Sequence, residues 1–322
     1  MIRIDPTFYF IFILIVSLSI ACDYQFDNPL DPKVSPDEWA STNLTATAID
    51  DQTIRLNWTD NCLFELGFRI ERKIGNGDFA QLCEVDADVT NCEDSGLNSD
   101  ELYIYRVKAY TQNNESGYSN EMVDPWHVID FDGNVYNTVK IGTQVWMDEN
   151  LKVTHYRNGN DIPNVTDGTG WSNLTTGAYC NYDNNPNNAN TYGRLYNWYA
   201  VIDNRNIAPT GWHVPSDADW QILIDYLGGY AFSGGKLKEA GTTHWISPNT
   251  GATNESGFSA LPAGYRYYNG SYFSLGGDAI FWSSTAGDLD TAWYRTLSYL
   301  STNVSRGNND EQNGFSLRLV RD

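Results

Sequence analysis

Short aromatic and glycine-rich motifs that recur from residue 135 to residue 318 constrain the fold of this chain more than any other feature. Two of them read Gly-Trp-His-Val-Pro at 211–215 and Gly-Phe-Ser-Leu-Arg at 314–318, and the others occupy 135–136, 144–147, 192–198, 258–266 and 281–285. Aromatic residues fill cores and glycine supplies unusual turn conformations, so these motifs predict the packing and turn residues of an irregular domain. They contain almost no catalytic chemistry, which favours display and binding over turnover.

The N-terminal segment has the order of an export signal. Arg3 precedes a continuous apolar run at 8–16, and small residues then lead to Cys22. This order predicts a signal peptide over residues 1–21, and the cysteine that follows resembles the lipobox of bacterial lipoproteins. The resemblance implies that Cys22 is lipidated and anchors an exported protein at the outer membrane or cell surface. An ordinary signal peptide or an uncleaved anchor is the alternative, although the apolar run falls short of the ~20 residues that span a bilayer.

The charge of the chain excludes one class of partner. Its 322 residues have a formal net charge of -21, with 41 Asp and Glu against 20 Lys and Arg. Proteins bind nucleic acids by releasing phosphate counterions with Lys and Arg, so no nucleic-acid partner is expected. The acidic excess instead favours a soluble surface protein.

Residues 22–40 are expected to form a stalk and residues 41–125 a first domain. The stalk has three prolines among aspartates and almost no apolar pattern. From Ser41 onward apolar residues alternate with polar ones, as in Ile54, Leu56 and Trp58, which is typical of strands with one buried face. Several such strands separated by turns predict an all-β sandwich.

The same residues resemble a fibronectin type III domain. Trp58 stands where the strand B tryptophan belongs, 67–72 is similar to strand C, and the spacing from 94–97 to Tyr103 is similar to a tyrosine corner. The resemblance implies a fibronectin type III sandwich that serves as a spacer, because a fold alone never implies a function. The chain has no Arg-Gly-Asp triplet, so integrin binding has no support.

The chain has five cysteines, and Cys22 is assigned to lipidation. Cys62, Cys83 and Cys92 fall in the first domain, where an exported protein can form a disulfide. Three cysteines allow three pairings, and the sequence does not choose between them. We expect Cys83 to pair with Cys92 and Cys180 to be alone in the second domain.

Residues 128–322 predict a second domain with one clear helix. Ser216 and Asp219 form a capping box, apolar residues recur on one face from Trp220, and the glycines at 228–229 end the helix. The remaining expectations are a shorter helix over 233–240, a hairpin around 132–133, an ordered loop over 156–190, and only short strands and loops after residue 245.

The motifs of this domain resemble those of the Fibrobacter succinogenes major paralogous domain. The resemblance runs through 211–216 and Trp220 to the closing segment 314–320. That family is related to the C-type lectin-like fold and, more distantly, to formylglycine-generating enzymes, so the resemblance implies an α+β C-type lectin-like domain. Many relatives have cysteines where this chain has Ala208 and Leu319, which is consistent with the loss of one disulfide.

No catalytic site and no cofactor are expected. Formylglycine-generating enzymes use cysteine thiols with copper, and Cys180 has no second thiol in its domain. No Gly-x-Ser-x-Gly elbow occurs. His213, within its Trp-His-Val-Pro turn, is expected to be a hydrogen-bonded structural residue. The histidines are scattered without zinc-binding spacing, at His127, His155, His213 and His244.

Calcium-dependent sugar binding is not expected either. C-type lectins that bind sugar use Glu-Pro-Asn or Gln-Pro-Asp followed by Trp-Asn-Asp, and this chain has none of these triplets. The Asn- and Asp-rich segments 181–190, 286–290 and 308–313 offer oxygen ligands for a cation. Polar turns explain such segments without a ligand, and we therefore predict no metal site.

Six aromatic residues mark the expected ligand-binding surface, in the region that forms the variable loops of C-type lectin-like folds. Rings next to Asn and Asp suit sugars or proteins, because they offer a large contact area with few torsions to freeze. We therefore expect a lipid-anchored surface protein that presents a non-catalytic binding domain for a glycan or a surface protein. A structural cell-envelope component is the alternative, and an extracellular hydrolase is a weaker one. The six residues are Tyr267, Tyr268, Tyr272, Phe273, Trp293 and Tyr294.

Overall fold

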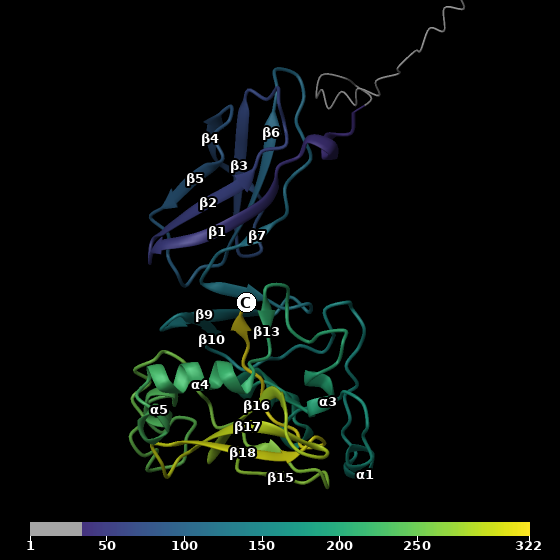
Figure 1. The fold of residues 1–322 in the computed structure, drawn as a ribbon, viewed down its shortest axis with the longest axis vertical. Coiled ribbons are helices and arrows are strands. Elements are labelled where there is room, and N and C mark those ends of the chain that lie inside the picture. The colour runs from purple at the N-terminus through teal and green to yellow at the C-terminus, as the bar shows by residue number, and fades with distance from the viewer. Residues whose placement is uncertain (1–33) are drawn as a thin grey trace, which may run out of the picture.

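In a computed structural model that describes residues 34–322, the chain forms two bodies that follow one another along the long axis of the molecule (Figure 1). The first body contains strands β1 to β7, and the second contains every element from β8 onward. The predicted signal peptide, residues 1–21, and the predicted lipidation site Cys22 lie outside the described residues. Within the described part of the chain, no helix is both long and apolar enough to cross a membrane.

The first body is a sandwich of two antiparallel sheets. One sheet has the order β1-β2-β5 and contains Thr42–Asp50 (β1), Thr53–Thr59 (β2) and Asn91–Ser95 (β5). The other has the order β4-β3-β6-β7 and contains Ala80–Asp86 (β4), Gly67–Ile74 (β3), Tyr103–Tyr110 (β6) and Met122–Val123 (β7). The predicted all-β sandwich is confirmed by this arrangement.

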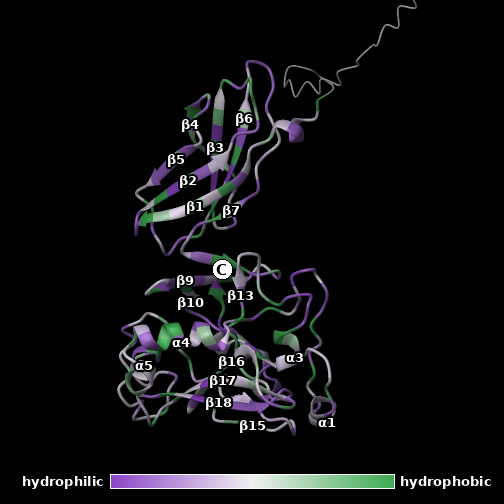
Figure 2. Ribbon diagram, viewed as in Figure 1, coloured by the Kyte–Doolittle hydropathy of each residue, from purple (hydrophilic) through white to green (hydrophobic). Residues whose placement is uncertain are grey.

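Alternation of apolar and polar residues gives β2 one buried face, as the sequence predicts, and bands of different hydropathy cross the strands of the first body (Figure 2). On β2, Ile54 and Leu56 are fully buried, and the Trp58 ring packs at 5.6 Å from the ring of Phe68 on β3. The Tyr103 hydroxyl accepts a hydrogen bond from the Asn98 amide at 3.1 Å, which is the backbone contact expected of a tyrosine corner.

The folded domain begins earlier than the predicted stalk allows. A 3-10 helix, Pro36–Trp39 (η1), ends on a tryptophan that is 2% exposed and belongs to the core of the first body. Asn61 donates a hydrogen bond to the Ala40 carbonyl at 2.8 Å. The stalk boundary at residue 40 is therefore wrong, because burial of one large apolar ring orders the segment around it.

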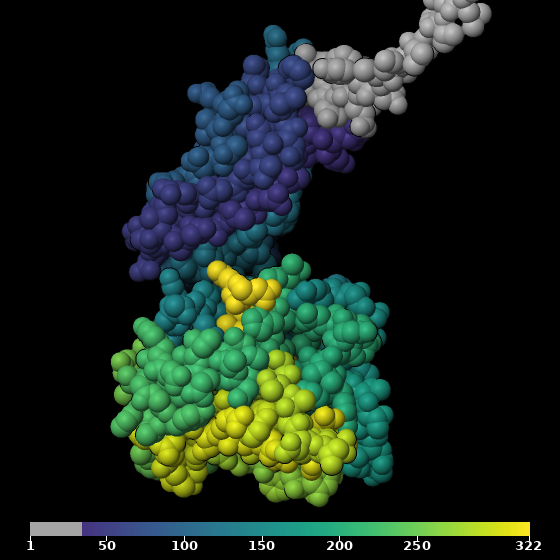
Figure 3. Space-filling model, viewed as in Figure 1, coloured from purple at the N-terminus to yellow at the C-terminus, as the bar shows by residue number. Residues whose placement is uncertain are grey.

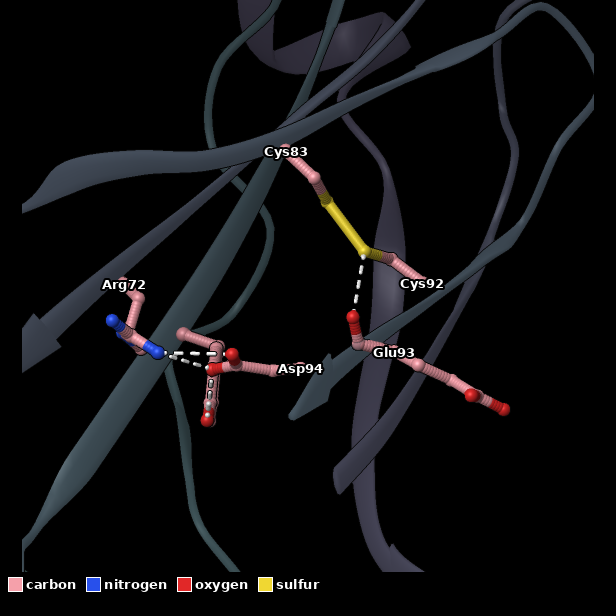
Figure 4. Close-up of a disulfide and its surroundings, with 6 residues drawn as sticks. Arg72, Cys83, Cys92, Glu93 and Asp94 are labelled. Atoms are coloured by element: carbon pink, nitrogen blue, oxygen red, sulfur yellow. Dashed lines mark hydrogen bonds and ion pairs between the residues drawn. A yellow bond between two sulfur atoms is a disulfide. The ribbon is translucent and has the colours of Figure 1, made fainter. Parts of the chain in front are cut away.

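Cys83 of β4 and Cys92 of β5 are joined by a disulfide (Figure 4). These two strands are edges of different sheets, so the bond links the sheets along one side of the sandwich. On the same side, Arg72 donates two hydrogen bonds to the Asp94 carboxylate, at 2.8 and 2.9 Å.

The connection between the two bodies is short and hydrogen-bonded on both sides. Asp124 is buried and accepts a hydrogen bond from the Tyr103 amide at 2.7 Å. Trp126 packs against the first core, and its carbonyl accepts from the Thr138 amide at 2.8 Å. The C-terminal residues lie at this junction (Figure 3), where Arg321 donates to a linker carbonyl at 2.8 Å.

The second body is built on an antiparallel sheet with the order β13-β19-β10-β9-β8. Because β19 pairs with β10, the last residues of the chain close onto the first strands of the domain. A meander of three longer strands lies apart from this sheet, and two short strand pairs complete the β structure. The strands are His127–Ile129 (β8), Val135–Ile141 (β9), Gln144–Met147 (β10), Trp212–His213 (β13), Val320–Arg321 (β19), the meander Asp278–Ala286 (β16), Thr291–Ser298 (β17) and Val304–Asp310 (β18), and the pairs Tyr179–Cys180 (β11) with Leu195–Tyr196 (β12) and Tyr265–Arg266 (β14) with Tyr272–Phe273 (β15).

The helices of the second body are short except for the predicted one. Asp217–Tyr226 (α4) begins with the predicted capping box of Ser216 and Asp219, and ends before Gly228, whose φ is 99°. The second predicted helix is real but begins earlier, at Tyr230–Leu237 (α5). The others are Gly168–Ser172 (α1), Tyr182–Asn184 (η2), Pro186–Tyr192 (α2) and Trp198–Val201 (α3).

Two other expectations for this domain have different outcomes. The hairpin around 132–133 is confirmed, since Ile129 pairs with Val135. The expectation of only short strands after residue 245 is wrong, because the meander strands have nine, eight and seven residues. In β16, a register shift against β17 between Trp282 and Ala286 interrupts the regular alternation of the strand.

Buried cationic side chains satisfy the backbone of the irregular loops. Loops of this kind leave carbonyl groups inside the protein, and each needs a hydrogen-bond donor. Arg266, Arg295 and Arg318 are at most 1% exposed. The Lys238 ammonium is buried and donates to three backbone carbonyls at 2.8, 2.9 and 3.0 Å. The motif arginines Arg266 and Arg318 are therefore structural residues of this domain.

Candidate binding surface

The β14–β15 hairpin brings three of the six predicted residues together on one surface. The centroid of the Tyr267 ring lies 4.3 Å from the centroid of the Tyr268 ring and 6.2 Å from that of the Phe273 ring. Tyr268 is 41% exposed and Phe273 is 43% exposed. Tyr265 joins them at 5.6 Å from Phe273. We call these four residues, 265, 267, 268 and 273, the aromatic hairpin.

Tyr265 is not among the predicted residues, because its motif, 258–266, predicts packing. Its ring does contact the core at Phe315, at 5.9 Å, but it is only half-buried. The alternation of 265 with 267 along the chain is the signal that puts both on one face of a strand.

Arg266 holds the base of the hairpin in place. Its buried guanidinium donates to the carbonyls of Val165 at 2.5 Å, Thr166 at 3.0 Å and Gly270 at 3.2 Å. The guanidinium also stacks on the Trp171 ring, 4.4 Å from its centroid. One side chain thus ties the hairpin to the loop before α1, which fixes the orientation of the exposed rings.

The tip of the hairpin is fixed by further hydrogen bonds. The Tyr268 amide donates to the Asn313 side chain at 2.8 Å, and the Tyr267 amide donates to the Ser271 carbonyl at the same distance. Gly314 exchanges two backbone hydrogen bonds with residue 266, at 2.7 and 3.0 Å. The rings are therefore presented on an ordered backbone, which lowers the entropy lost when a ligand binds.

The surface beside the aromatic hairpin is acidic. Partial burial, the Tyr268 hydroxyl and the Asp310 carboxylate raise the pKa of Tyr267, so its phenol is neutral at pH 7. Burial and the Asp290 carboxylate raise the pKa of Glu311. Among residues 34–322, no ion pair involves these three acidic residues. Such a surface favours neutral ligands rich in hydroxyl groups, or cationic ones, over anions.

The other three predicted residues do not belong to this surface, which corrects the expectation of one six-residue site. Tyr272 points to the opposite side of the hairpin, 5.2 Å from the ring of Tyr182, and its hydroxyl donates to Asn184 at 2.9 Å. Tyr294 packs into the core. Trp293 is covered by Arg306, whose guanidinium carbon lies 3.3 Å from the centroid of the tryptophan ring.

A groove between the two bodies is the main concave alternative to this surface. It is lined by β1 of the first body, by β9 of the second and by the linker residues Pro125 and Trp126. Its polar lining includes charges of both signs, Asp50 and Lys140 among them, and it has no cluster of exposed rings. The aromatic hairpin lies at the other end of the second body, where Figure 1 places β15.

His213 and Cys180 of the second body have structural surroundings. His213 contacts Asp322 at 2.6 Å and Asp219 at 3.3 Å, as expected for a hydrogen-bonded structural residue. Burial raises the pKa of the Cys180 thiol to about 11. Ala208 and Leu319 lie in one apolar core cluster.

The Asn- and Asp-rich segments belong to several elements, since 181–190 contains η2 and part of α2, and 308–310 ends β18. In the described residues, the segments 181–190, 286–290 and 308–313 supply no three carboxylate, thiol or imidazole groups close enough to share an ion. Segment 286–290 forms the turn between β16 and β17, and Asn185 caps α2.

Solved structures with a likeness to this chain match its first body. One described as a myokine structure is 22% identical over 28% of this chain and 95% of its own, with a TM-score of 0.25. A fibronectin type III-like protein from Clostridium thermocellum is 23% identical over 26% and 86%, with a TM-score of 0.23. A fibronectin type III domain of human collagen XX is 20% identical over 26% and 86%, with a TM-score of 0.24. These matches include fibronectin type III domains, and the first body is an all-β sandwich of two antiparallel sheets.

The second body is matched by a family rather than by a curated protein. A search of curated proteins gave no match. The model of the Fibrobacter succinogenes major domain family matches residues 139–321, which is more than half of the chain and spans every motif from β10 to β19. This chain belongs to the Fibrobacter succinogenes major domain family.

Proposed function

We propose that this protein is a lipid-anchored surface protein whose C-terminal domain binds a glycan through the aromatic hairpin. One observation carries the proposal: the exposed rings of Tyr268 and Phe273 and the half-buried ring of Tyr267 gather on an ordered backbone beside acidic residues. Aromatic rings stack on the apolar faces of sugar rings. Neighbouring carboxylates accept hydrogen bonds from sugar hydroxyls, and side-chain amides can both donate to them and accept from them.

The arrangement of the two bodies supports a display role. β15 lies at the end of the molecule farthest from the first body, and the described chain begins at the other end (Figure 1). An anchor at Cys22 would leave the aromatic hairpin facing away from the membrane. The hydrogen-bonded linker at residues 124–126 would make the fibronectin type III-like body a stiff spacer.

A C-type lectin-like fold for the second body is part of the proposal. Pairing of β19 with β10 joins the two ends of the domain, and long loops rather than helices present the aromatic hairpin. We propose that the domain is non-catalytic. The support is that its one thiol is buried with a raised pKa and that its histidines contact carboxylates on separate elements.

Two other roles would give different results in the experiment that tests this proposal. A structural cell-envelope component would bind another surface protein and no soluble glycan. An extracellular hydrolase would release products from a polysaccharide.

A glycan array tests the proposal with the described fragment, residues 34–322, in calcium and in chelator. We expect calcium-independent binding of a neutral glycan. Phe273→Ala and Tyr268→Ala are expected to weaken it about tenfold or more, the effect of removing a buried interface ring. Phe232→Ala is the matched control, because Phe232 is an exposed ring (64%) on α5, away from the hairpin.

Equal losses in Phe273→Ala and Phe232→Ala would refute the assignment of the surface. A blank array with crosslinks to envelope proteins would favour the structural role, and turnover of a polysaccharide would favour the hydrolase.

A further inference from the structure

Three carboxylates meet at one end of the first body, in a place that the sequence assigned to no function. Asp60 and Glu65 lie in the connection from β2 to β3, and Asp88 lies in the turn from β4 to β5. Both connections occupy the same end of the sandwich, since residue 57 pairs with 91 and residue 67 pairs with 86. One carboxylate oxygen from each residue lies within 4.8 Å of the other two.

Glu65 is the unusual member of this group. Only 8% of the residue is exposed, and its Oε2 atom is buried without a hydrogen-bond partner. Its other oxygen accepts a hydrogen bond from the Asp88 amide at 3.2 Å. A buried carboxylate with an unpaired oxygen is costly, and two neighbouring carboxylates add repulsion. Among residues 34–322, no Lys, Arg or His forms an ion pair with any of the three.

The loop that holds this group has one apolar anchor, Cys62, which is 4% exposed and belongs to the core of the first body. Leu63 is 82% exposed, Phe64 is 56% exposed and Leu66 is 55% exposed. Polar contacts also hold the loop, such as the hydrogen bond from the Cys62 amide to the Asp60 carboxylate at 2.8 Å. A positive charge among the carboxylates would add stability to a loop in which Leu63, Phe64 and Leu66 contribute little hydrophobic burial.

We propose that Asp60, Glu65 and Asp88 bind a divalent cation of the calcium class and that this ion orders the β2–β3 loop. Calcium binds carboxylate oxygens at about 2.3–2.6 Å, so two ligands on opposite sides of one ion lie up to about 5 Å apart. The separations in this group fit that limit. Asp88 is exposed, which leaves water access to complete the coordination shell.

The site departs from the prediction that the chain binds no metal. The candidate ligands that the sequence suggests lie in the Asn- and Asp-rich segments of the second body, where many of them are adjacent. The three ligands proposed here are spread over 29 positions, from 60 to 88, and only the pairing of strands brings them together.

The test is calcium titration of the full chain in detergent, after treatment with a chelator, by isothermal titration calorimetry. We expect saturable binding of one calcium ion per chain, with magnesium chloride as the second probe. Amide hydrogen exchange at 60–66 and 87–90 should slow when calcium is added. At a calcium concentration 100 times the dissociation constant, the unfolding equilibrium constant of the first body should fall about a hundredfold.

Glu65→Gln and Asp88→Asn each remove one charge with little change of shape, and each should weaken calcium binding at least tenfold. Asp86→Asn is the matched control, because Asp86 is an exposed carboxylate at the end of β4, outside the cluster. Asp88→Asn tests the site even if Glu65→Gln does not fold, since Asp88 is on the surface.

Two results would overturn the proposal. Calcium binding that persists unchanged in both variants would be counterion attraction by an acidic chain. Absence of binding in the wild type, together with calcium-independent stabilisation by Glu65→Gln, would show that the carboxylates share a proton instead of a metal ion.

Discussion

Replacing Arg318 tests whether buried arginines stabilise the second body by satisfying loop carbonyls. Arg318 is fully buried, and its guanidinium donates four hydrogen bonds, at 2.5 to 3.1 Å. The acceptors are the Asn150 side chain and the carbonyls of residues 147, 258 and 259, which belong to separate segments. Burial lowers the pKa of Arg318 to about 9, so the group is still protonated at pH 7.

The expected cost of Arg318→Met follows from these contacts. Each unpaired buried acceptor costs about 1–3 kcal/mol, and removal of one member of a buried charged network costs about 3–5 kcal/mol. Because the methionine fills part of the space, we expect about 4 kcal/mol. For a domain of this size, each kcal/mol lowers the melting temperature by about 2–4 °C, which gives a loss of about 8–16 °C.

Calorimetry of residues 34–322 measures this effect, because the two bodies are expected to unfold in separate transitions. The transition of the second body should move, and that of the first should not. Lys236→Met is the control, because Lys236 makes only a long, exposed ion pair with Glu255, worth about 0–1 kcal/mol. A loss below about 1 kcal/mol for Arg318→Met would refute the reasoning, since water would then satisfy the carbonyls equally well.

Three further predictions concern single features of the fold. Burial acts to raise the pKa of the Asp217 carboxyl, but Arg306 and Arg295 together hold this pKa below its usual value of 3.8. The stability that the Asp217 carboxylate contributes is therefore present above pH 3.8 and is lost as the pH falls through the lowered pKa. Asp217→Asn should cost about 3 kcal/mol at pH 7, and urea titrations should show the gap to the wild type closing in acid. The Cys83→Ser/Cys92→Ser variant should lower the stability of the first body by about 2–3 kcal/mol, and a reductant should lower only the wild type. Gly264→Ala should destabilise the hairpin in thermal melts more than Gly211→Ala. Both glycines have positive φ, but a Cβ at 264 would clash with the backbone at residues 273 and 275, whereas nothing lies within 4 Å at 211.

Much of the local structure could be predicted from the sequence because its causes are local. The alternation through Trp58 sets one buried face on β2, and the capping box at 216 and 219 starts α4 where it was expected. Both signals act between residues two to four positions apart. The sequence also placed three rings of the candidate surface in one segment, 267 to 273.

Tertiary structure alone decided which of the predicted rings are available. Trp293 is covered by Arg306 of the neighbouring strand, so its ring is not available to a ligand. The pleat of β15 directs Tyr272 toward Tyr182, on the other side of the hairpin. The roles of Arg318 and of the Asp60 cluster likewise depend on segments that meet only in the folded chain. Sequence determines what a short stretch prefers, but the burial and charge of each side chain are set by neighbours that topology brings to it.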